Sequence, residues 1–504
     1  MKVARHLSLG RSRWSIEGGL RCGITKLSPT AAVIALVAGV ALTGGLLAAQ
    51  GLPPAQMNRP APVMLPPVTA GAAALEGGVA GQTGSGTLAL SLDQAIQMGL
   101  RNNLAPIIAG NAGEEARANR MAAVAALLPR VDASAGEQRQ KINLAAFGFS
   151  FPGIPSLVGP FNVFQASAAA SVPILNLSAL DNARAAGAMQ KVAQANYQST
   201  RNLVVLAVAN QYLLTIADQS RVQTAQAELA TAQSELAQAQ DMLHAGTVNA
   251  LTAVRAQVQR DRQRQQLTAQ QNALAKQRLQ LARAIGLPLS QNFTLASTPA
   301  FTQIAVPEAA QAVAEALTTR PDYRAAQAAE HAAKLLIAAA DAERLPTFGL
   351  AGNWGTIGHE IGSNHPIFSF GASLNVPVFA GGAYHADRLR AQAQFRNAAS
   401  RLADLRAQID VEVRSALLDL ASNRDQVTVA QDAQAMAHQE LQLAQDRFKA
   451  GVADNLEVVQ AQQAVADADE STISSLYAYN VAKAQLAQAL GVAASRYQQY
   501  LATH

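Results

Sequence analysis

The sequence predicts an α+β membrane protein, in which four strands per chain contribute to a β-barrel and long helices form a coiled coil. Three observations predict this class: strand segments that alternate apolar with small polar residues, alanine and leucine at heptad spacing, and a set of motifs that occurs twice. The composition agrees, because 50% of the 504 residues are hydrophobic while only 5% are aromatic and 14% are charged. Long stretches rich in Ala, Gln, Leu and Arg are typical of long helices and not of a compact enzyme.

The chain begins with a predicted export signal at 1–49. Residues 1–26 are basic, and the apolar run AAVIALVAGVALTGGLLAA follows at Ala31–Ala49. A basic segment, an apolar segment and small residues are the parts of such a signal. The run of 19 residues is also long enough to remain as a membrane anchor, and the sequence leaves both outcomes open.

The charge distribution argues against a nucleic-acid partner. Residues 1–26 hold six Lys and Arg against Glu17, which accounts for the whole formal net charge of +5. The rest of the chain is about neutral and offers no general electrostatic attraction to phosphates. Cys22, the only cysteine of the sequence, lies within the signal. We therefore expect no disulfide, thiolate metal site or cysteine nucleophile in the exported chain.

A set of motifs occurs twice in the same order, which predicts an internal two-fold repeat. The turn LHAGTVNALTAVRAQ begins at Leu243, and its counterpart FKAGVADNLEVVQAQ begins 205 residues later at Phe448. Each half reads as a helix of about 35 residues interrupted at Pro106 or Pro321, two strands, a very long helix, the turn and another long helix. The expected domains are the export signal at 1–49, a Pro/Gly/Ala-rich linker at 50–87, the first repeat at 88–290, a connector at 291–307, the second repeat at 308–494 and a C-terminal tail at 495–504.

The predicted strands carry the pattern of membrane strands. In NVFQASAAASV (Asn162–Val172) and FSFGASLNV (Phe368–Val376), apolar residues alternate with small or polar ones. The preceding strands, Val131–Gln140 and Thr347–Trp354, alternate more weakly. One apolar and one polar face over about ten residues suit lipid on one side and water on the other. A half-buried soluble hairpin is the alternative for any single strand, but two matching hairpins on an exported chain favour a barrel.

Prolines mark the expected junctions between strands and helices: Pro129, Pro173, Pro346 and Pro377. Pro129 to Pro173 spans 44 positions whereas Pro346 to Pro377 spans 31, so the first half holds a longer insertion, expected as a loop at Phe147–Phe161. Open sheet edges cannot lie in lipid, and a barrel needs about eight or more strands. Three chains with four strands each would supply twelve, which predicts a homotrimer.

The helix from Ser178 to Leu243 would be roughly 100 Å long. Both long helices step by 4 and 3 residues between small and large side chains, as knobs-into-holes packing requires. These positions are Ala225, Leu229, Ala232, Leu236, Ala239 and Leu243, and then Ala430, Gln434, Ala437, Leu441, Ala444 and Phe448. Gly246 and Gly451 are expected to end the helices, and Asn249 and Asp454 to cap the next ones.

Taken in order, the signal, the duplicated halves, SVPIL/NVPVF, the two turns and AIGLP/ALGVA resemble the TolC-type outer membrane efflux proteins over about residues 88–494. The resemblance implies a trimer whose twelve-stranded barrel lies in outer membrane lipid and continues as a long α-helical barrel in the periplasm. It implies a channel subunit for small molecules, with a periplasmic adaptor (membrane fusion) protein and an inner-membrane transporter as partners. A duct for type I protein secretion has the same architecture, and a trimeric coiled-coil structural protein without a pore is the alternative of another class.

The resemblance makes the two repeated turns the periplasmic tips, beside which adaptor hairpins dock. The docking candidates are Gly246, Thr247, Val248, Asn249 and Leu251 in the first turn, and Gly451, Val452, Ala453 and Leu456 in the second. Where the family has a basic residue that helps to tie the closed state, this chain has Ala453.

A gate is expected just after the second turn. In the family, two acidic positions one helical turn apart ring the constriction there. They fall on Glu457 and Gln460 in this chain, so one acidic ring is kept and one is lost. We expect a weaker cation preference than two rings would give. Asp454 lies nearby, and Thr252 falls where the first turn often has an acid. A solvated helix face is the alternative for Glu457.

Catalytic and cofactor motifs were not found in the sequence. HEIGSNH, at His359–His365, lacks the HExxH spacing and lies between predicted strands, so a loop is expected there and not a metal site. No Gly-rich phosphate loop with its Lys follows a strand. We expect neither an enzyme nor a bound cofactor or metal, with the energy for transport coming from a partner.

Overall fold

The computed structural model describes residues 77–79, 86–148, 155–296, 301–450, 452 and 455–501. The predicted export signal and most of the linker lie outside the described residues. The contacts divide the described chain into a small unit with Gly136–Phe164 and Gly358–Asn364, and a large unit with the remaining residues.

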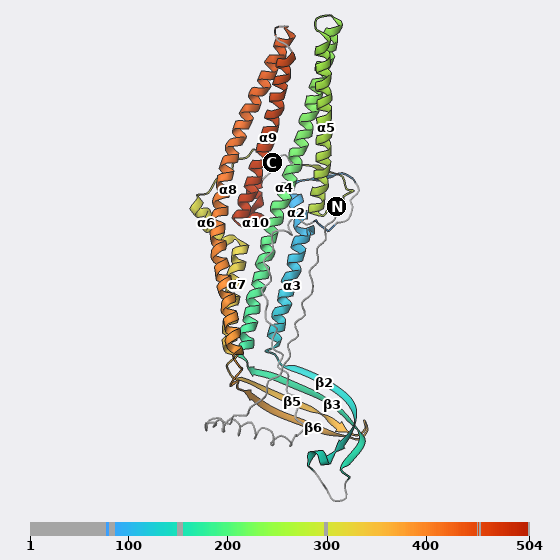
Figure 1. Ribbon diagram of the computed structural model, residues 1–504, viewed down its shortest axis with the longest axis vertical. Coiled ribbons are helices and arrows are strands. Elements are labelled where there is room, and N and C mark those ends of the chain that lie inside the picture. Colours follow the sequence, from blue (N-terminus) through green and yellow to red (C-terminus); the bar gives the residue numbers. More distant parts are fainter. Residues whose placement is uncertain are drawn as a thin grey trace, which may run out of the picture. The chain divides into compact units, whose positions relative to one another are not determined.

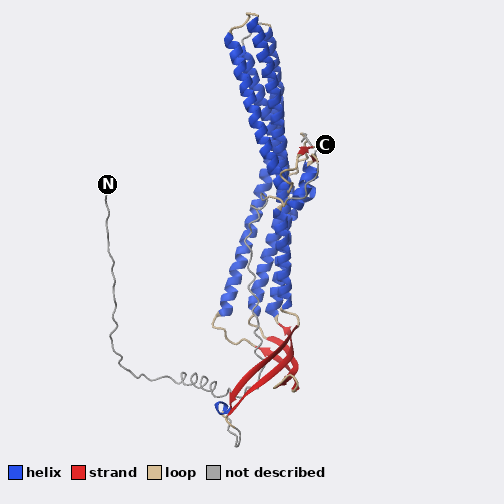
Figure 2. Cartoon of the chain, turned by 90° about the vertical axis from the view of Figure 1, so that its right-hand side faces the viewer, coloured by secondary structure: helices blue, strands red, loops and turns tan. Residues whose placement is uncertain are grey.

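Helices make up most of the large unit (Figures 1 and 2), and their order is the same in both halves. The first half has α2 (Leu92–Asn102), α3 (Leu104–Ala125), α4 (Leu177–His244) and α5 (Ala250–Ile285). The second half has α6 (Ala309–Thr319), α7 (Pro321–Ala342), α8 (Ala383–Lys449) and α9 (Asn455–Ala489), followed by α10 (Ala493–Leu501).

The predicted interruption of the first helix in each half is present. Asn103 has extended backbone between α2 and α3, and its side chain accepts a hydrogen bond from the Ala105 N–H at 2.9 Å, which caps α3. Pro106 follows within the first turn of α3, and Pro321 is the first residue of α7. Both prolines stand where a helix needs no N–H from them.

The two halves end in matching turns at Gly286 and Gly491. Both glycines take the left-handed conformation, with φ of 71° and 74°. The carbonyl just before Gly286 accepts from Asn102 Nδ2 at 3.1 Å, and the carbonyl just before Gly491 accepts from Thr319 Oγ1 at 2.5 Å. A Cβ at Gly491 would lie 2.6 Å from the Cα of Arg320, so both the conformation and the space require glycine.

The four predicted strands are confirmed and form one sheet in the order β2-β3-β5-β6. Their bounds are β2 (Arg130–Asn143), β3 (Leu157–Leu175), β5 (Thr347–Gly358) and β6 (Asn364–Asn375). Pro129 and Pro346 immediately precede β2 and β5, whereas Pro377 follows β6 and Pro173 lies inside β3.

The loop predicted at Phe147–Phe161 is too long. β3 already begins at Leu157, and the Leu144 N–H donates to the Ser156 carbonyl at 2.6 Å, so pairing with β2 starts before Pro160. Pro and Gly predicted a turn here, but pairing with β2 overrides this local preference.

Large apolar side chains of the sheet are uncovered. Phe368 and Phe370 of β6 are 84% and 78% exposed, Leu374 is 64% exposed and Trp354 of β5 is 71% exposed. A half-buried soluble hairpin would cover its apolar face, because each such side chain is stabilised by about 1.5–3 kcal/mol on burial. The observed exposure therefore argues against that alternative.

Two apolar clusters hold the helices together. The first joins α2, α4, α5 and α10 around Tyr212, Leu281 and Ile285, and the second joins α6, α8 and α9 around Ile409 and Leu486. α4 packs against α3, α5, α7 and α9, while α8 packs against α7 and α9. Among the described residues, no helix combines the length and the apolar character needed to cross a membrane.

The predicted heptads are confirmed at their small positions. Ala225, Ala232 and Ala239 of α4 are 2–4% exposed, and Ala430, Ala437 and Ala444 of α8 are 3–7% exposed. The larger side chains between them are half-buried.

Some short elements were not predicted. β1 (Leu88–Leu90) pairs in parallel with β4 (Phe293–Leu295), which lies in the segment predicted as a connector. Residues predicted as a tail form most of α10, whose Tyr497 and Leu501 are buried. Elements of this length contain too few residues to display a period.

Candidate gate at the helix tips

The first tip joins α4 to α5 and has the predicted geometry. Gly246 is left-handed, with φ of 72°. The Thr247 N–H donates to the Met242 carbonyl at 3.0 Å, and its Oγ1 donates to the same oxygen at 2.9 Å, so the end of α4 is satisfied. Asn249 caps α5 as predicted, because its Oδ1 accepts from the N–H and the hydroxyl of Thr252, both at 3.1 Å. Thr252 therefore stabilises the cap.

The second tip joins α8 to α9. The Val452 N–H donates to the Arg447 carbonyl at 3.1 Å, which is the counterpart of the bond in the first tip. Apolar side chains are exposed at both tips: Leu251 is 52%, Val452 69% and Leu456 52% exposed. Val248 of the first tip is half-buried. Three predicted tip residues lie outside the described residues, namely Gly451, Ala453 and Asp454.

Glu457 lies in the first turn of α9 and is half exposed. Its Oε1 is 3.2 Å from the Nε of Arg447, in the last turn of α8, and the two side chains are 44% and 58% exposed. Sequence reasoning missed Arg447, although it lies only ten residues before Glu457 across a turn. The ion pair partly neutralises the carboxylate proposed for the gate. Gln460, one turn further along α9, is exposed.

An arginine links the two helical hairpins further from the tips. Arg221 of α4 binds Glu470 of α9 through three hydrogen bonds, from Nε to Oε2 at 2.9 Å and to Oε1 at 3.1 Å, and from Nη2 to Oε1 at 2.7 Å. Its Nη1 donates to Asp218 at 2.8 Å. The pKa of Arg221 is raised, first by the hydrogen bonds to Glu470. The planar guanidinium suits this three-way contact.

Carboxylates continue this contact between α4 and the α8–α9 hairpin toward the tips. Burial, and then the nearby Asp469, raise the pKa of Glu228. Asp469 of α9 accepts from Gln434 Nε2 of α8 at 2.7 Å and lies 3.3 Å from the His438 ring.

Glu235 is the next carboxylate of α4. Its Oε1 accepts from Gln445 of α8 at 3.5 Å and from Gln462 of α9, and burial raises its pKa. The link between the hairpins thus changes along α4, from a paired arginine to carboxylates held by neutral amides.

The described residues contain no group of three His, Cys, Asp or Glu side chains placed to hold a metal ion. The loop predicted at His359–His365 lies between β5 and β6 but is shorter, because Asn364 and His365 already belong to β6. The His359 ring lies 3.0 Å from the Ser363 hydroxyl.

Comparison with known proteins gives the chain a family context. A family model described as "Outer membrane efflux protein" matches residues 109–287 and 312–492. The chain is 26% identical over 381 residues to the toluene efflux pump outer membrane protein TtgF of Pseudomonas putida, covering 73% of this chain and 76% of that protein. It is 28% identical over 415 residues to the pyoverdine export outer membrane protein OpmQ of Pseudomonas putida, covering 79% and 85%.

Solved channel structures share the fold. The Campylobacter jejuni CmeC outer membrane channel aligns with a TM-score of 0.71 at 19% identity, over 80% of this chain and 86% of that chain. The outer membrane protein VceC of Vibrio cholerae aligns with a TM-score of 0.69 at 17% identity, over 79% and 96%.

Proposed function

The chain belongs to the outer membrane efflux protein family, and on that premise we propose that it is a passive, gated exit duct for small molecules. It is an outer membrane component of an efflux system, with a helical domain in the periplasm. The observation that carries the proposal is that the family match covers both halves of the chain. Each half supplies a strand pair and a helical hairpin in the same order, as a two-fold repeat would.

We propose that three chains assemble, so that their sheets close as a barrel of twelve strands and their long helices form a helical barrel. The helices at the lateral edges support this, because α5 packs on α4, α4 on α9 and α9 on α8, which leaves α5 and α8 at the two edges. Both edges expose heptad-spaced apolar residues, namely Leu251 and Val258 of α5 and Val429, Met436 and Leu443 of α8. Packing α5 of one chain against α8 of the next would cover both stripes.

The charges at these edges are complementary. Exposed cations at heptad spacing follow α5, namely Arg255, Arg262 and Lys276. Exposed carboxylates at heptad spacing follow α8, namely Asp425, Asp432 and Asp446. α5 runs away from its tip and α8 runs toward its tip, so two such edges would meet antiparallel. Asp425 and Asp446 also form ion pairs within α8, with Arg424 and Lys449, so Asp432 is the carboxylate of this set without such a pair among the described residues. A contact between two different surfaces of the same kind of chain is heterologous, and such contacts can close into a ring.

The tips are proposed as the gate and the docking site for a periplasmic adaptor, which in turn binds an inner-membrane transporter. Three Glu457 side chains around one axis would attract cations. Each is paired with Arg447, and Gln460 adds no charge, so the preference is expected to be weak. The exposed Leu251, Val452 and Leu456 supply apolar contacts for an adaptor. The relatives named for toluene and pyoverdine differ in cargo, which fits a duct whose pump selects the substrate.

Planar-bilayer recording of the purified trimer tests the gate. Small cation-preferring current steps are expected for the wild type, with the preference lost in Glu457→Ala and reversed in Glu457→Lys. Glu440→Ala, which removes an exposed carboxylate nine residues before the end of α8, is the matched control and should behave as the wild type. If the ion selectivity of the Glu457 variants equals that of the wild type, the gate proposal is wrong and the channel proposal stands. If the protein gives no current steps and stays soluble without detergent, the channel proposal is refuted.

A further inference from the structure

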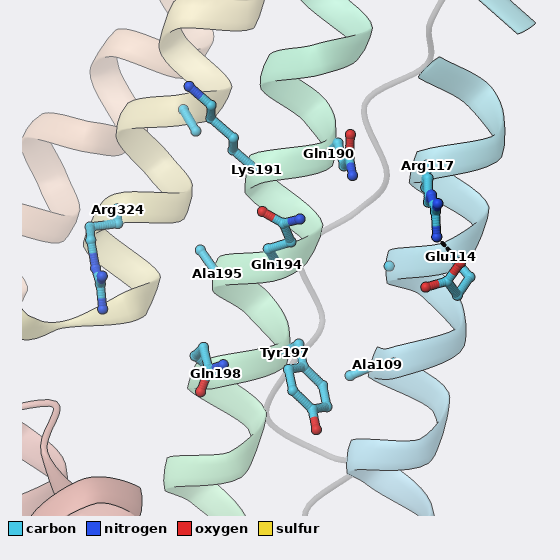
Figure 3. A pocket seen from close by; sticks show the side chains of 13 residues that line it. Ala109, Glu114, Arg117, Gln190, Lys191, Gln194, Ala195, Tyr197, Gln198 and Arg324 are labelled. Atoms are coloured by element: carbon cyan, nitrogen blue, oxygen red, sulfur yellow. Dashed lines mark ion pairs between the residues drawn. The ribbon is translucent and has the colours of Figure 1, made fainter. Parts of the chain in front are cut away.

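A cavity lies between α3, α4 and α7 and takes no part in the proposed gate (Figure 3). Its volume of about 820 Å³ is within the range of sites that bind small molecules. α4 lies between the other two helices and packs against both, so the cavity has a wall from each helix.

Two glycines keep the α3 wall of this cavity open. Gly110 and Gly113 lie in the interior of α3, where glycine is among the poorest helix formers. A Cβ added at Gly113 would meet nothing within 4 Å, and one added at Gly110 would meet only Tyr197 Cε2 at 3.8 Å. Neither close packing nor a positive φ within the chain accounts for these glycines. Their effect is to leave space beside Tyr197.

The charges that line the cavity are mainly positive. Arg117 of α3, Lys191 of α4 and Arg324 of α7 line it together with one carboxylate, Glu114. Glu114 is paired with Arg117 at 3.5 Å. Arg324 donates to the Thr319 carbonyl at 3.0 Å and, like Lys191, forms no ion pair with any described carboxylate. Two cations from different helices are therefore available to a ligand.

The remaining polar groups suit an anion that also carries a flat apolar part. Gln190, Gln194 and Gln198 lie four residues apart along α4 and line the cavity, as Figure 3 shows. Their amides can donate to oxygen atoms of a ligand. Tyr197 of α4 supplies an aromatic ring that points toward α3 (Figure 3). Small-molecule sites usually combine an apolar lining with a few polar groups that orient the ligand, and this cavity offers both.

We infer that the cavity is a binding site for small organic anions that contain an aromatic ring, such as aromatic carboxylates and sulfonates. Lys191 and Arg324 attract the anionic group, and the space beside Gly113 and Tyr197 receives the ring. Assigning such anions to the transported cargo rests on the proposed function, whereas the binding itself does not.

Binding of naphthalene-2-sulfonate to the full-length protein in neutral detergent tests the inference, with empty micelles as the blank. Gly113→Leu places a side chain into open space, so it should weaken binding at least tenfold while leaving the melting temperature unchanged or raised. Lys191→Gln should weaken binding about three- to tenfold, since one charge-assisted contact is lost. Lys334→Gln, which removes an exposed lysine of α7 that does not line the cavity, should have no effect. The neutral naphthalene-2-sulfonamide should bind more weakly than the sulfonate.

Equal binding of the two probes would overturn the inference, as would sulfonate binding that neither Gly113→Leu nor Lys191→Gln reduces. Lys191→Gln keeps the test decisive if Gly113→Leu fails to fold. Bilayer recording of the same preparations separates the two proposals. If the protein conducts but does not bind the sulfonate, the proposed binding site is refuted and the proposed exit duct stands. If the protein binds the sulfonate but never conducts, the proposed binding site stands and the proposed exit duct is refuted.

Discussion

Replacing Arg221 should loosen the contact between the two helical hairpins and open the channel more often. The guanidinium joins α4 to Glu470 of α9 by three hydrogen bonds and also binds Asp218. Arg221→Gln keeps a polar side chain but removes the charge and the fork, which leaves the Asp218 carboxylate, 12% exposed, without its partner. Glu470 is 52% exposed, so water solvates its carboxylate when the ion pair with Arg221 is lost.

The expected magnitude follows from these exposures. The half-exposed pair with Glu470 is worth about 1 kcal/mol or less. The unpartnered Asp218 adds about 1 kcal/mol, because a carboxylate near the surface recovers part of its hydration. If opening separates α9 from α4, each chain contributes about 1–2 kcal/mol, and every 1.4 kcal/mol changes an equilibrium tenfold. In the proposed trimer, the fraction of time that the channel spends open should therefore rise at least tenfold.

Single-channel recording in planar bilayers measures that fraction directly. Arg414→Gln is the matched control, since it breaks an ion pair within α8 alone, with Asp410, and leaves the hairpins joined. Arg221→Gln combined with Glu470→Gln should open less than the sum of the single changes, because both remove the same contact. Open times in Arg221→Gln that match those of Arg414→Gln would refute the idea that this contact holds the channel closed.

Two further predictions concern buried titratable groups of the helical domain. Burial raises the pKa of Glu235 above its ordinary value of 4.5, so the stability tied to this group is fully present below 4.5 and is lost as pH rises through the raised pKa. Melting temperatures recorded from acid to neutral pH should therefore fall with pH more steeply in the wild type than in Glu235→Gln, and parallel curves would contradict this. Burial also lowers the pKa of Lys483, 2% exposed and 5.3 Å above the Tyr479 ring, to about 8. Lys483→Met should stabilise the protein by about 1–3 kcal/mol at pH 7, because at that pH the lysine stays mostly charged and its charge is costly to bury. A lower melting temperature than the wild type would refute this prediction.

Most of the architecture could be predicted from the sequence because it rests on long periodic segments. The heptads of α4 and α8 run for many turns, and the alternation in β3 and β6 lasts about ten residues. Single residues fixed the ends of these elements, as at Gly246 and Asn249, where one backbone conformation and one side-chain oxygen suffice. Duplication then supplied an independent check, since each motif had to fit two places.

Short and non-periodic features could not be predicted from the sequence. β1 and β4 are each too short to show a pattern, and the helix α10 is held by its buried Tyr497 and Leu501. The start of β3 was misplaced because Pro160 is a local turn signal, whereas pairing with β2 is a contact between separate segments. The ion pair of Glu457 with Arg447 changes the expected strength of the gate, and it depends on how α8 and α9 face each other.

By itself, the sequence determined the class of molecule, the order of its elements and the position of both tips, because backbone conformation and the placement of apolar residues are read locally. Tertiary structure alone decided which charges meet. Arg320 is 3% exposed between Asp322 and Glu412, at 2.6 Å and 2.5 Å, and the second of these partners is 92 residues away. The Arg221 contact and the cavity beside Gly113 likewise join helices far apart in the chain. Such groupings depend on helix rotation and register, which are set by the sum of many packing contacts and by no single motif.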